Sequence, residues 1–495
     1  MFRRSFVAGA MALALAATSG AAFAQGSAPT VKIKQGVLAG AATADAVSYL
    51  GIPYAAPPVG ELRWKLPAAG PSWTGARDAT KPGASCEKDV EDCLYLNVTT
   101  PVGAKPGAKL PVMVWIHGGG FVIGTSMAAF GATHDGSEFA KKGVITVTLN
   151  YRLGHAGFFA HPAIDREGHT ANYGLADQVA ALKWVKANIA SFGGDPSNVT
   201  IFGESAGGIS VLYLMLAPEA KGLFQKAIGE SSFPRHNPYD MAKADGMGER
   251  AAKAAGVEGS DAAAAAALRA LPLSKLPYEG GFTERAQPIL DNKLITSGIA
   301  QGFAASRQIK VPLIVGGNSN EASLFRPKAE DFDKLPAPAQ QAVSAAYDPD
   351  HKGDKLRTMN EFITDTYITE PDRNVARAAT KAGEPVWLYF FSFVPEKARA
   401  TSQGAGHVNE VRFVWSGDKQ KFLPEEVPLS KAMNAYWAAF AKSGNPDSAG
   451  GVAWPKFDAA KEASIEFGSD GVKTHEHQFK ARLDVAEKLQ PKSWP

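Results

Sequence analysis

The sequence of 495 residues has only two cysteines, Cys86 and Cys93. After the N-terminal region it has no run of 18 apolar residues, so we expect no membrane-spanning helix in the mature chain. The charges nearly cancel, since 52 lysines and arginines face 49 aspartates and glutamates. A nearly neutral chain without a basic stripe is a poor candidate for nucleic-acid binding. The shares of 45% hydrophobic and 20% charged residues exclude a disordered chain, a collagen and a coiled coil.

The first 24 residues are typical of a leader that is removed on export. Arg3 and Arg4 form a basic start, residues 6–17 are apolar, and Ala22-Phe23-Ala24 is a small-x-small cleavage site. A membrane anchor would need a longer apolar run. We therefore predict a bacterial-type signal peptide over residues 1–24, and a soluble protein exported to the periplasm or beyond. The Arg-Arg pair leaves both general and twin-arginine export open.

The cysteine pair fits this location. Six residues separate Cys86 from Cys93, and a close pair in an oxidising compartment usually forms a disulfide. A metal site would need further ligands, and no histidine flanks either cysteine. We predict a Cys86–Cys93 bridge.

Apolar strand-like segments alternate with helix-like segments along the rest of the chain. The strand candidates are residues 112–116, 144–149, 199–202, 311–315 and 386–393, and the helix candidates include 175–189 and 206–216. Continuous apolar strands between helices indicate an α/β fold with a mostly parallel central sheet and helices on both faces. Residues 234–308 lack a strong strand pattern and favour a helical insertion. No linker divides residues 25–495, which we treat as one domain.

The sharpest motif is Gly203-Glu204-Ser205-Ala206-Gly207, a G-x-S-x-G between a strand and a helix. A serine on such a tight turn is exposed as a nucleophile, and the flanking glycines let the backbone approach neighbouring strands. A serine that only capped the helix would not need these small neighbours. We predict that Ser205 is the nucleophile.

A glycine-rich stretch, His117-Gly118-Gly119-Gly120-Phe121, directly follows the strand at 112–116. Glycines leave backbone N–H groups unshielded, and such groups stabilise the oxyanion of acyl transfer. The alternative is a plain glycine turn.

The base that activates the serine should be a histidine after Ser205, with the acid between them in the chain. His407 lies in a small-residue loop after the strand at 386–393. His236 follows Ser205 too closely, with no further sheet strand between them to carry an acid. His351 lies in a charged loop, and His475 and His477 lie in a polar C-terminal stretch. We choose His407, and an unperturbed imidazole predicts a loss of activity below about pH 6.5.

For the acid, Glu321 lies in a loop at the carboxyl end of the strand at 311–315, where open α/β sheets build their sites. Asp291 is the rival, but the apolar run before it is too short for a central strand. We choose Glu321.

These motifs resemble the type-B carboxylesterases, the cholinesterase-like branch of the α/β-hydrolases. The similar stretches run through most of the chain in order; they are 51–64 (GIPYAAPPVGELRW), 91–98 (EDCLYLNV), 112–121 (VMVWIHGGGF), 150–154, 172–178, 192–208 (FGGDPSNVTIFGESAGG), 316–325, 404–410 (GAGHVNE), 440–446 and 454–457. One departure is Glu230-Ser231-Ser232, where the family usually has Gln-Ser-Gly. Ser231 is then a candidate for a supporting position behind the site.

The resemblance implies a serine carboxylesterase with nucleophile Ser205, acid Glu321 and base His407. It implies an oxyanion hole from the N–H groups of Gly119, Gly120 and Ala206, and a paired Cys93. Such an enzyme acts on a small-molecule ester and needs no cofactor and no metal. A lipase is the second candidate. A binding protein on the same fold is the alternative outside enzymes, and it would not need the serine turn and the glycines.

Substrate preference is less defined by the sequence. The aromatic residues that could line a pocket are Phe121, Phe233, Phe282, Tyr367, Phe391 and Trp415, and each could equally fill the core. In cholinesterases the loop closed by the second cysteine is long and presents a tryptophan to the quaternary ammonium. Here residues 87–92 contain no aromatic residue, so we expect a general carboxylesterase.

Overall fold

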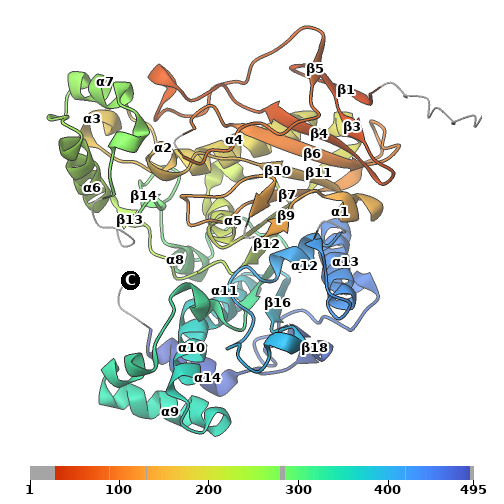
Figure 1. Cartoon of the computed structure of the whole chain (residues 1–495), viewed down its shortest axis with the longest axis vertical. Helices are drawn as coiled ribbons and strands as arrows, with labels where there is room; N and C mark the ends of the chain where they lie inside the picture. The colour runs from red at the N-terminus through yellow and green to blue at the C-terminus, as the bar shows by residue number, and fades with distance from the viewer. Residues whose placement is uncertain (1–27, 89, 130, 279–284, 418–419, 491–495) are drawn as a thin grey trace, which may run out of the picture.

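The protein is described here by a computed structural model, which describes residues 28–88, 90–129, 131–278, 285–417 and 420–490 (Figure 1). The predicted leader and Phe282 lie outside these residues. No helix in the described ranges is long and apolar enough to cross a bilayer.

The centre of the molecule is a sheet in which 11 described strands follow the order β18-β17-β16-β15-β12-β11-β7-β10-β6-β4-β3. Within the segment β17-β16-β15-β12-β11-β7-β10, every two neighbouring strands are parallel. Antiparallel pairs close both edges, which the sequence analysis did not foresee. The strands of this sheet are β3 (Ala41–Ala42), β4 (Ala46–Pro53), β6 (Tyr95–Pro101), β7 (Leu110–Ile116), β10 (Ile145–Leu149), β11 (Gly194–Glu204), β12 (Lys226–Glu230), β15 (Leu313–Asn318), β16 (Val386–Phe391), β17 (Ser464–Gly468) and β18 (Gly471–His475).

Small sheets lie outside the central one. Their strands are β1 (Thr30–Ile33), β2 (Gly36–Ala39) and β5 (Ala76–Asp78) in one, β8 (Ala128–Ala129) and β9 (Ala132–Thr133) in another, and β13 (Tyr239–Asp240) and β14 (Ile289–Leu290) in a third.

Alternation along the central strands divides the core between the two faces of the sheet. On β7, Val112 and Val114 belong to one buried cluster, whereas Met113 and Trp115 belong to another. Successive side chains of a strand point to opposite faces, so a strand buried on both sides reads as a continuous apolar run. This is why β7, β10, β15 and β16 could be predicted from sequence.

Helices cover both faces, as predicted. Residues of α4, α5 and α11 belong to the cluster on the Val112 face, and residues of α12 and α13 belong to the cluster on the Met113 face. The helices are α1 (Ser137–Lys141), α2 (Gly154–Gly157), α3 (Pro162–Asp165), α4 (Tyr173–Asn188), α5 (Ala206–Leu216), α6 (Met241–Ala254), α7 (Ala262–Ala270), α8 (Ile299–Ala304), α9 (Ala337–His351), α10 (Lys355–Thr364), α11 (Glu370–Lys381), α12 (Val411–Trp415), α13 (Val427–Ser443) and α14 (Lys480–Lys488).

The insertion predicted over residues 234–308 contains α6, α7 and α8, with the short strand β13 before α6 and β14 between α7 and α8. Figure 1 shows α6 and α7 together with α3 on one side of the molecule, away from α9 and α14. Alanines of α6 and α7 pack there with Trp64 and Phe159.

The structure corrects three statements about histidine surroundings. Strand β12 lies between Ser205 and His236, so the argument that no sheet strand separates them was wrong. This strand has the sequence KAIGE and is fully buried, although two of its five residues are charged. His351 ends helix α9 rather than lying in a loop. His475 ends edge strand β18, where its Nε2 lies 2.8 Å from Glu466 Oε2, rather than in a solvated tail.

Candidate active site

Ser205 lies at the turn between strand β11 and helix α5, as predicted. Its backbone has φ 56° and ψ −121°, a conformation that residues other than glycine rarely adopt. Its N–H donates to the carbonyl of Glu230 at the end of β12, 2.9 Å away. A Cβ on Gly207 would lie 2.0 Å from the carbonyl oxygen of Ile116. The glycine therefore allows the turn to press against β7.

The glycine loop after β7 is held from behind by His117. Its Nδ1 lies 2.8 Å from the carbonyl oxygen of Gly118, its ring stacks on Tyr151, and the Tyr151 hydroxyl donates to the His117 carbonyl at 2.9 Å. Burial lowers the pKa of His117 to about 4, so the imidazole is neutral. The anchored loop follows a path with φ 106° at Gly119.

The predicted oxyanion groups come from two different segments of the chain. Gly119 and Gly120 follow β7, whereas Ala206 begins α5. In the described part of the chain, none of their three N–H groups donates a hydrogen bond to another protein group. An N–H without a protein partner can donate to a developing oxyanion.

His407 connects the predicted nucleophile and acid. The Nδ1 of His407 lies 2.5 Å from Glu321 Oε2, and its Nε2 lies 2.9 Å from Ser205 Oγ. Because a carboxylate accepts only, Nδ1–H donates to Glu321 and leaves Nε2 to accept from the serine hydroxyl. When His407 is neutral, it is thus in the tautomer that proton abstraction by a base requires.

Glu321 is held by donors on its other oxygen. The Ser231 hydroxyl donates to Oε1 at 2.6 Å, and the Asn318 N–H donates to the same oxygen at 2.7 Å. The rival Asp291 lies elsewhere, where its Oδ1 accepts the N–H groups of Lys293, Leu294 and Ile295, each at 3.0 Å. Asp291 caps a turn, and of the two rivals it is the Glu321 carboxylate that lies beside His407.

Two further carboxyl groups lie near His407 that the sequence reasoning missed. The Oε1 of Glu204 lies 3.2 Å from His407 Nε2, so a charge on either group stabilises a charge on the other. Glu410 accepts from the side-chain amide of Asn318, and burial raises its pKa to about 7. The sequence offered a signal for each, since Glu204 precedes the nucleophile and Glu410 ends the GHVNE stretch.

Among the aromatic pocket candidates, Phe233 lies closest to the chemistry, with its ring edge-on to His407 at 5.7 Å. Tyr367 stacks on Phe325, which contacts Phe233. Phe121 packs on Phe158. Phe391 and Trp415 belong to the core cluster on the Met113 face of the sheet. The sequence did not single out Phe325.

The two cysteines form a disulfide. Inside the loop that it closes, the Glu87 carboxylate accepts the N–H of Gly124 at 2.7 Å, which ties the loop to the turn after the glycines. Among the described residues, no group of three or more His, Cys, Asp or Glu side chains is arranged to hold a metal ion.

The carboxylates around His407 change the expected pH dependence. Burial opposes a charge on His407, but Glu204 and Glu321 outweigh it and raise its pKa from 6.5 to about 9. Only neutral His407 can take a proton, so kcat/KM should fall as the pH drops through a midpoint well above 6.5. Glu204→Gln removes one of these carboxylates and should lower that midpoint by about one unit.

The measurement is the pH profile of kcat/KM for the wild type and Glu204→Gln. Glu466→Gln is the matched control, because it removes a carboxylate from a different histidine, His475. The control should keep the wild-type midpoint. An unchanged midpoint in Glu204→Gln would contradict the role given to its charge.

Comparison with known proteins identifies the family of the chain. Residues 27–486 match the model of the carboxylesterase family. The chain is 35% identical to para-nitrobenzyl esterase of Bacillus subtilis, over 85% of this chain and 91% of that protein. It is 32% identical to fumonisin B1 esterase of Sphingopyxis macrogoltabida, over 86% of this chain and 84% of that protein. It is 34% identical to human cocaine esterase, over 85% of this chain and 83% of that protein.

Solved structures show the same fold. A para-nitrobenzyl esterase structure superposes with a TM-score of 0.80 at 33% identity, covering 92% of this chain and 99% of that one. A carboxylesterase of Geobacillus stearothermophilus gives a TM-score of 0.80 at 30% identity with the same coverage. The resemblance found in the sequence motifs is confirmed: the chain belongs to the carboxylesterase family of α/β-hydrolases and is a carboxylic ester hydrolase.

Proposed function

We propose that this protein is an exported serine carboxylesterase that forms an acyl-enzyme on Ser205, with His407 as base and Glu321 as acid. The observation that carries the proposal is the continuous hydrogen-bonded chain from Glu321 through His407 to Ser205. A nucleophile, a base within hydrogen-bond reach and a group that orients the base are the parts that acyl transfer requires.

Each half of the reaction uses the same groups. Neutral His407 takes the proton of Ser205 Oγ as this oxygen attacks the ester carbonyl. The N–H groups of Gly119, Gly120 and Ala206 stabilise the oxyanion, and protonated His407 then gives its proton to the leaving alcohol. Water enters, loses a proton to His407 and releases the acid. Glu321 keeps Nδ1 protonated and balances the charge on the ring.

The proposal includes export. Residues 1–24 act as the signal peptide, and residues 25–495 form the mature single-domain enzyme. A disulfide in the glycine-loop region supports this location, because such bonds persist in oxidising compartments.

The test is covalent labelling of the purified mature protein with a fluorophosphonate. Peptide mass spectrometry should find the label on Ser205, and p-nitrophenyl acetate or butyrate should protect against labelling. A label on another residue would refute the assignment of the nucleophile.

We expect uncharged esters to be preferred over choline esters. The loop closed by the disulfide has no aromatic residue, and an aromatic cage is worth about 1–2 kcal/mol, or roughly tenfold or more, to a quaternary ammonium. Acetylcholine should therefore have no higher kcat/KM than 3,3-dimethylbutyl acetate, its uncharged carbon isostere. A choline preference of about tenfold would reveal another cation site.

A further inference from the structure

The five residues after strand β12, 231–235, form a strained loop that we call the β12 loop. Ser231 has φ 47° and Phe233 has φ 43°, both in the left-handed region. Residues other than glycine are rare there, because the side chain strains the backbone. Such a conformation persists only where surrounding contacts impose it.

The β12 loop contacts both partners of the proposed nucleophile. The Ser231 hydroxyl donates to Glu321 Oε1 at 2.6 Å, and the Phe233 ring meets the His407 ring edge-on at 5.7 Å. Any shift of this loop therefore moves or frees the acid and the base together.

Helix α11 holds the loop at two points. Arg235 forms a two-point ion pair with Glu370, with Nε 2.9 Å from Oε2 and Nη2 2.7 Å from Oε1. The Ser232 hydroxyl donates to Asp372 Oδ1 at 3.4 Å. A glycine at position 232, as is usual in the family, could not make this contact. The Glu370 side chain is fully buried and that of Arg235 is 23% exposed, so little water competes for the pair.

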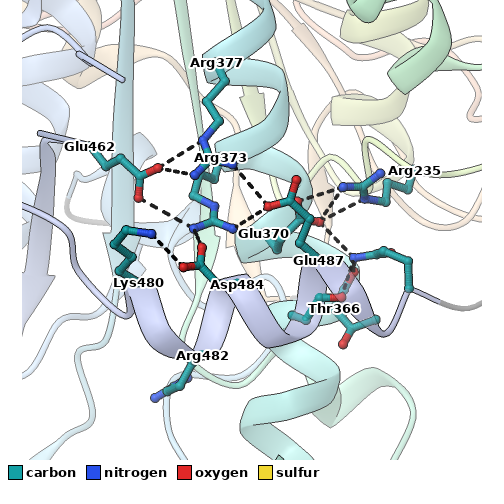
Figure 2. Close-up of polar contacts among 12 residues, drawn as sticks. Arg235, Thr366, Glu370, Arg373, Arg377, Glu462, Lys480, Arg482, Asp484 and Glu487 are labelled. Atoms are coloured by element: carbon teal, nitrogen blue, oxygen red, sulfur yellow. Dashed lines mark hydrogen bonds and ion pairs between the residues drawn. The ribbon is translucent and has the colours of Figure 1, made fainter. Parts of the chain in front are cut away.

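Glu370 is in turn fixed from the outer side by the C-terminal segment. Gln490 donates its side-chain amide to Glu370 Oε2 at 2.8 Å. Figure 2 shows helix α14 crossing α11 near Glu370 and Arg373, with Asp484 and Glu487 reaching Arg373; the distances are 2.9 and 3.0 Å. Arg373 is 2% exposed, so these pairs hold α14 tightly against α11.

From these contacts we propose that Arg235 is a positioning residue. Its ion pair with Glu370, braced by the C-terminal segment, holds the β12 loop so that Ser231 and Phe233 keep Glu321 and His407 aligned with Ser205. The proposal rests on the proposed function, because it concerns the alignment of those three side chains.

The expected effect follows from the distance sensitivity of catalysis. A misplacement of 1 Å in a reacting group can cost about 10²-fold in rate. Arg235→Gln leaves Ser231 and Phe233 in place chemically and loosens only their support. We therefore expect kcat to fall by about tenfold, with KM changed less than twofold, since Arg235 lies behind the loop rather than against the substrate.

The experiment compares Arg235→Gln with Arg269→Gln in the full-length mature protein. Arg269 is the matched control: it forms a two-point pair with Glu167 at 2.6 and 2.9 Å and its side chain is 7% exposed, but it lies on α7 in the insertion. The readouts are kcat and KM for p-nitrophenyl butyrate and the thermal midpoint. Arg269→Gln should lose stability without the loss in kcat.

A double-mutant cycle with Glu370→Gln shows whether the pair acts as a unit. The Arg235→Gln/Glu370→Gln variant should lose no more kcat than the worse single variant. Arg235→Lys keeps the positive charge but lacks the planar guanidinium that pairs with both carboxylate oxygens. Its kcat should be about threefold higher than that of Arg235→Gln. If Arg235→Gln does not fold, Arg235→Lys tests the proposal instead, and its kcat should be about threefold below that of the wild type.

A kcat of Arg235→Gln within twofold of that of Arg269→Gln would overturn the proposal, as would a loss that appears in KM. The proposal would also be overturned if the loss of kcat in the double variant equalled the product of the losses in the two single variants. Fluorophosphonate labelling of the wild type separates the two proposals. Label away from Ser205 refutes the proposed function, whereas label on Ser205 with unaltered Arg235→Gln kinetics refutes only the positioning role.

Discussion

Replacing Ser205 by alanine should lower kcat by about 10⁵–10⁶-fold, the loss expected when the nucleophile of a serine hydrolase is removed. Ser205 Oγ lies 2.9 Å from His407 Nε2 and is the proposed atom of attack. Without it, His407 can activate only water, and the remaining rate comes from the oxyanion groups and substrate binding.

Folding should survive this change. The Ser205 N–H still donates to the Glu230 carbonyl in the variant, and alanine meets the same backbone strain as serine. The thermal midpoint should therefore match that of the wild type.

The matched control is Ser210→Ala in the same helix. Ser210 is also buried, but its hydroxyl donates to the Ala206 carbonyl at 2.8 Å, within the helix. Its kcat should stay within a few-fold of the wild type. Retention of more than about 1% of wild-type kcat in Ser205→Ala would show that another residue is the nucleophile.

The parts of the fold that the sequence predicted are those with strong local patterns. Strands β7, β10, β15 and β16 are buried on both faces, so their residues form unbroken apolar runs. Strand β12 is just as buried but carries a lysine and a glutamate in five residues. Lys226 donates to Asn198, and Glu230 accepts from Trp437. Tertiary contacts thus pair polar groups that a local pattern counts against a strand.

The site residues also divide into those that a local sequence pattern predicts and those that tertiary contacts bring together. Ser205, Glu321 and His407 each follow a predicted strand, and parallel strands bring their carboxyl ends to one edge of the sheet. The supporting groups follow no such rule. Glu370 reaches Arg235 across 135 positions in the chain, and Arg373 reaches Asp484 across 111. Such pairs depend on how the helices pack against one another. A single sequence without an alignment does not specify that packing.

The site residues remain predictions that the labelling and kinetic experiments address, and the signal peptide remains a prediction from the sequence. The family and the ester-hydrolase activity do not depend on them, because they follow from the match over residues 27–486 and from relatives that share about a third of their residues.

Replacing Gly119 by alanine should lower kcat by about 10²–10³-fold, the usual cost of losing an oxyanion donor. Gly119 has φ 106°, and a Cβ there would lie 2.1 Å from the carbonyl oxygen of Ile123. The N–H groups of Val122 and Ile123 both donate to the Gly119 carbonyl at 3.1 Å. The loop therefore cannot accept the methyl group without a backbone shift, and that shift moves the N–H groups of Gly119 and Gly120.

The matched control is Gly103→Ala. Gly103 has a similar left-handed φ of 77°, but no atom lies within 4 Å of the position of its Cβ. This variant carries the backbone strain without the clash, so it should lose some stability and keep its kcat. A loss below tenfold in Gly119→Ala, or an equal loss in Gly103→Ala, would contradict the oxyanion role.

Combining Gly119→Ala with Ser205→Ala separates the two contributions. The activity that remains after loss of the serine arises largely from the oxyanion groups and substrate binding. If Gly119 and Gly120 stabilise the oxyanion whichever nucleophile attacks, Gly119→Ala should reduce this remaining rate further. If the glycine loop served only to place Ser205, Gly119→Ala would have no further effect once the hydroxyl is gone. Single-turnover hydrolysis of p-nitrophenyl acetate by both variants therefore distinguishes transition-state stabilisation from support of the nucleophile.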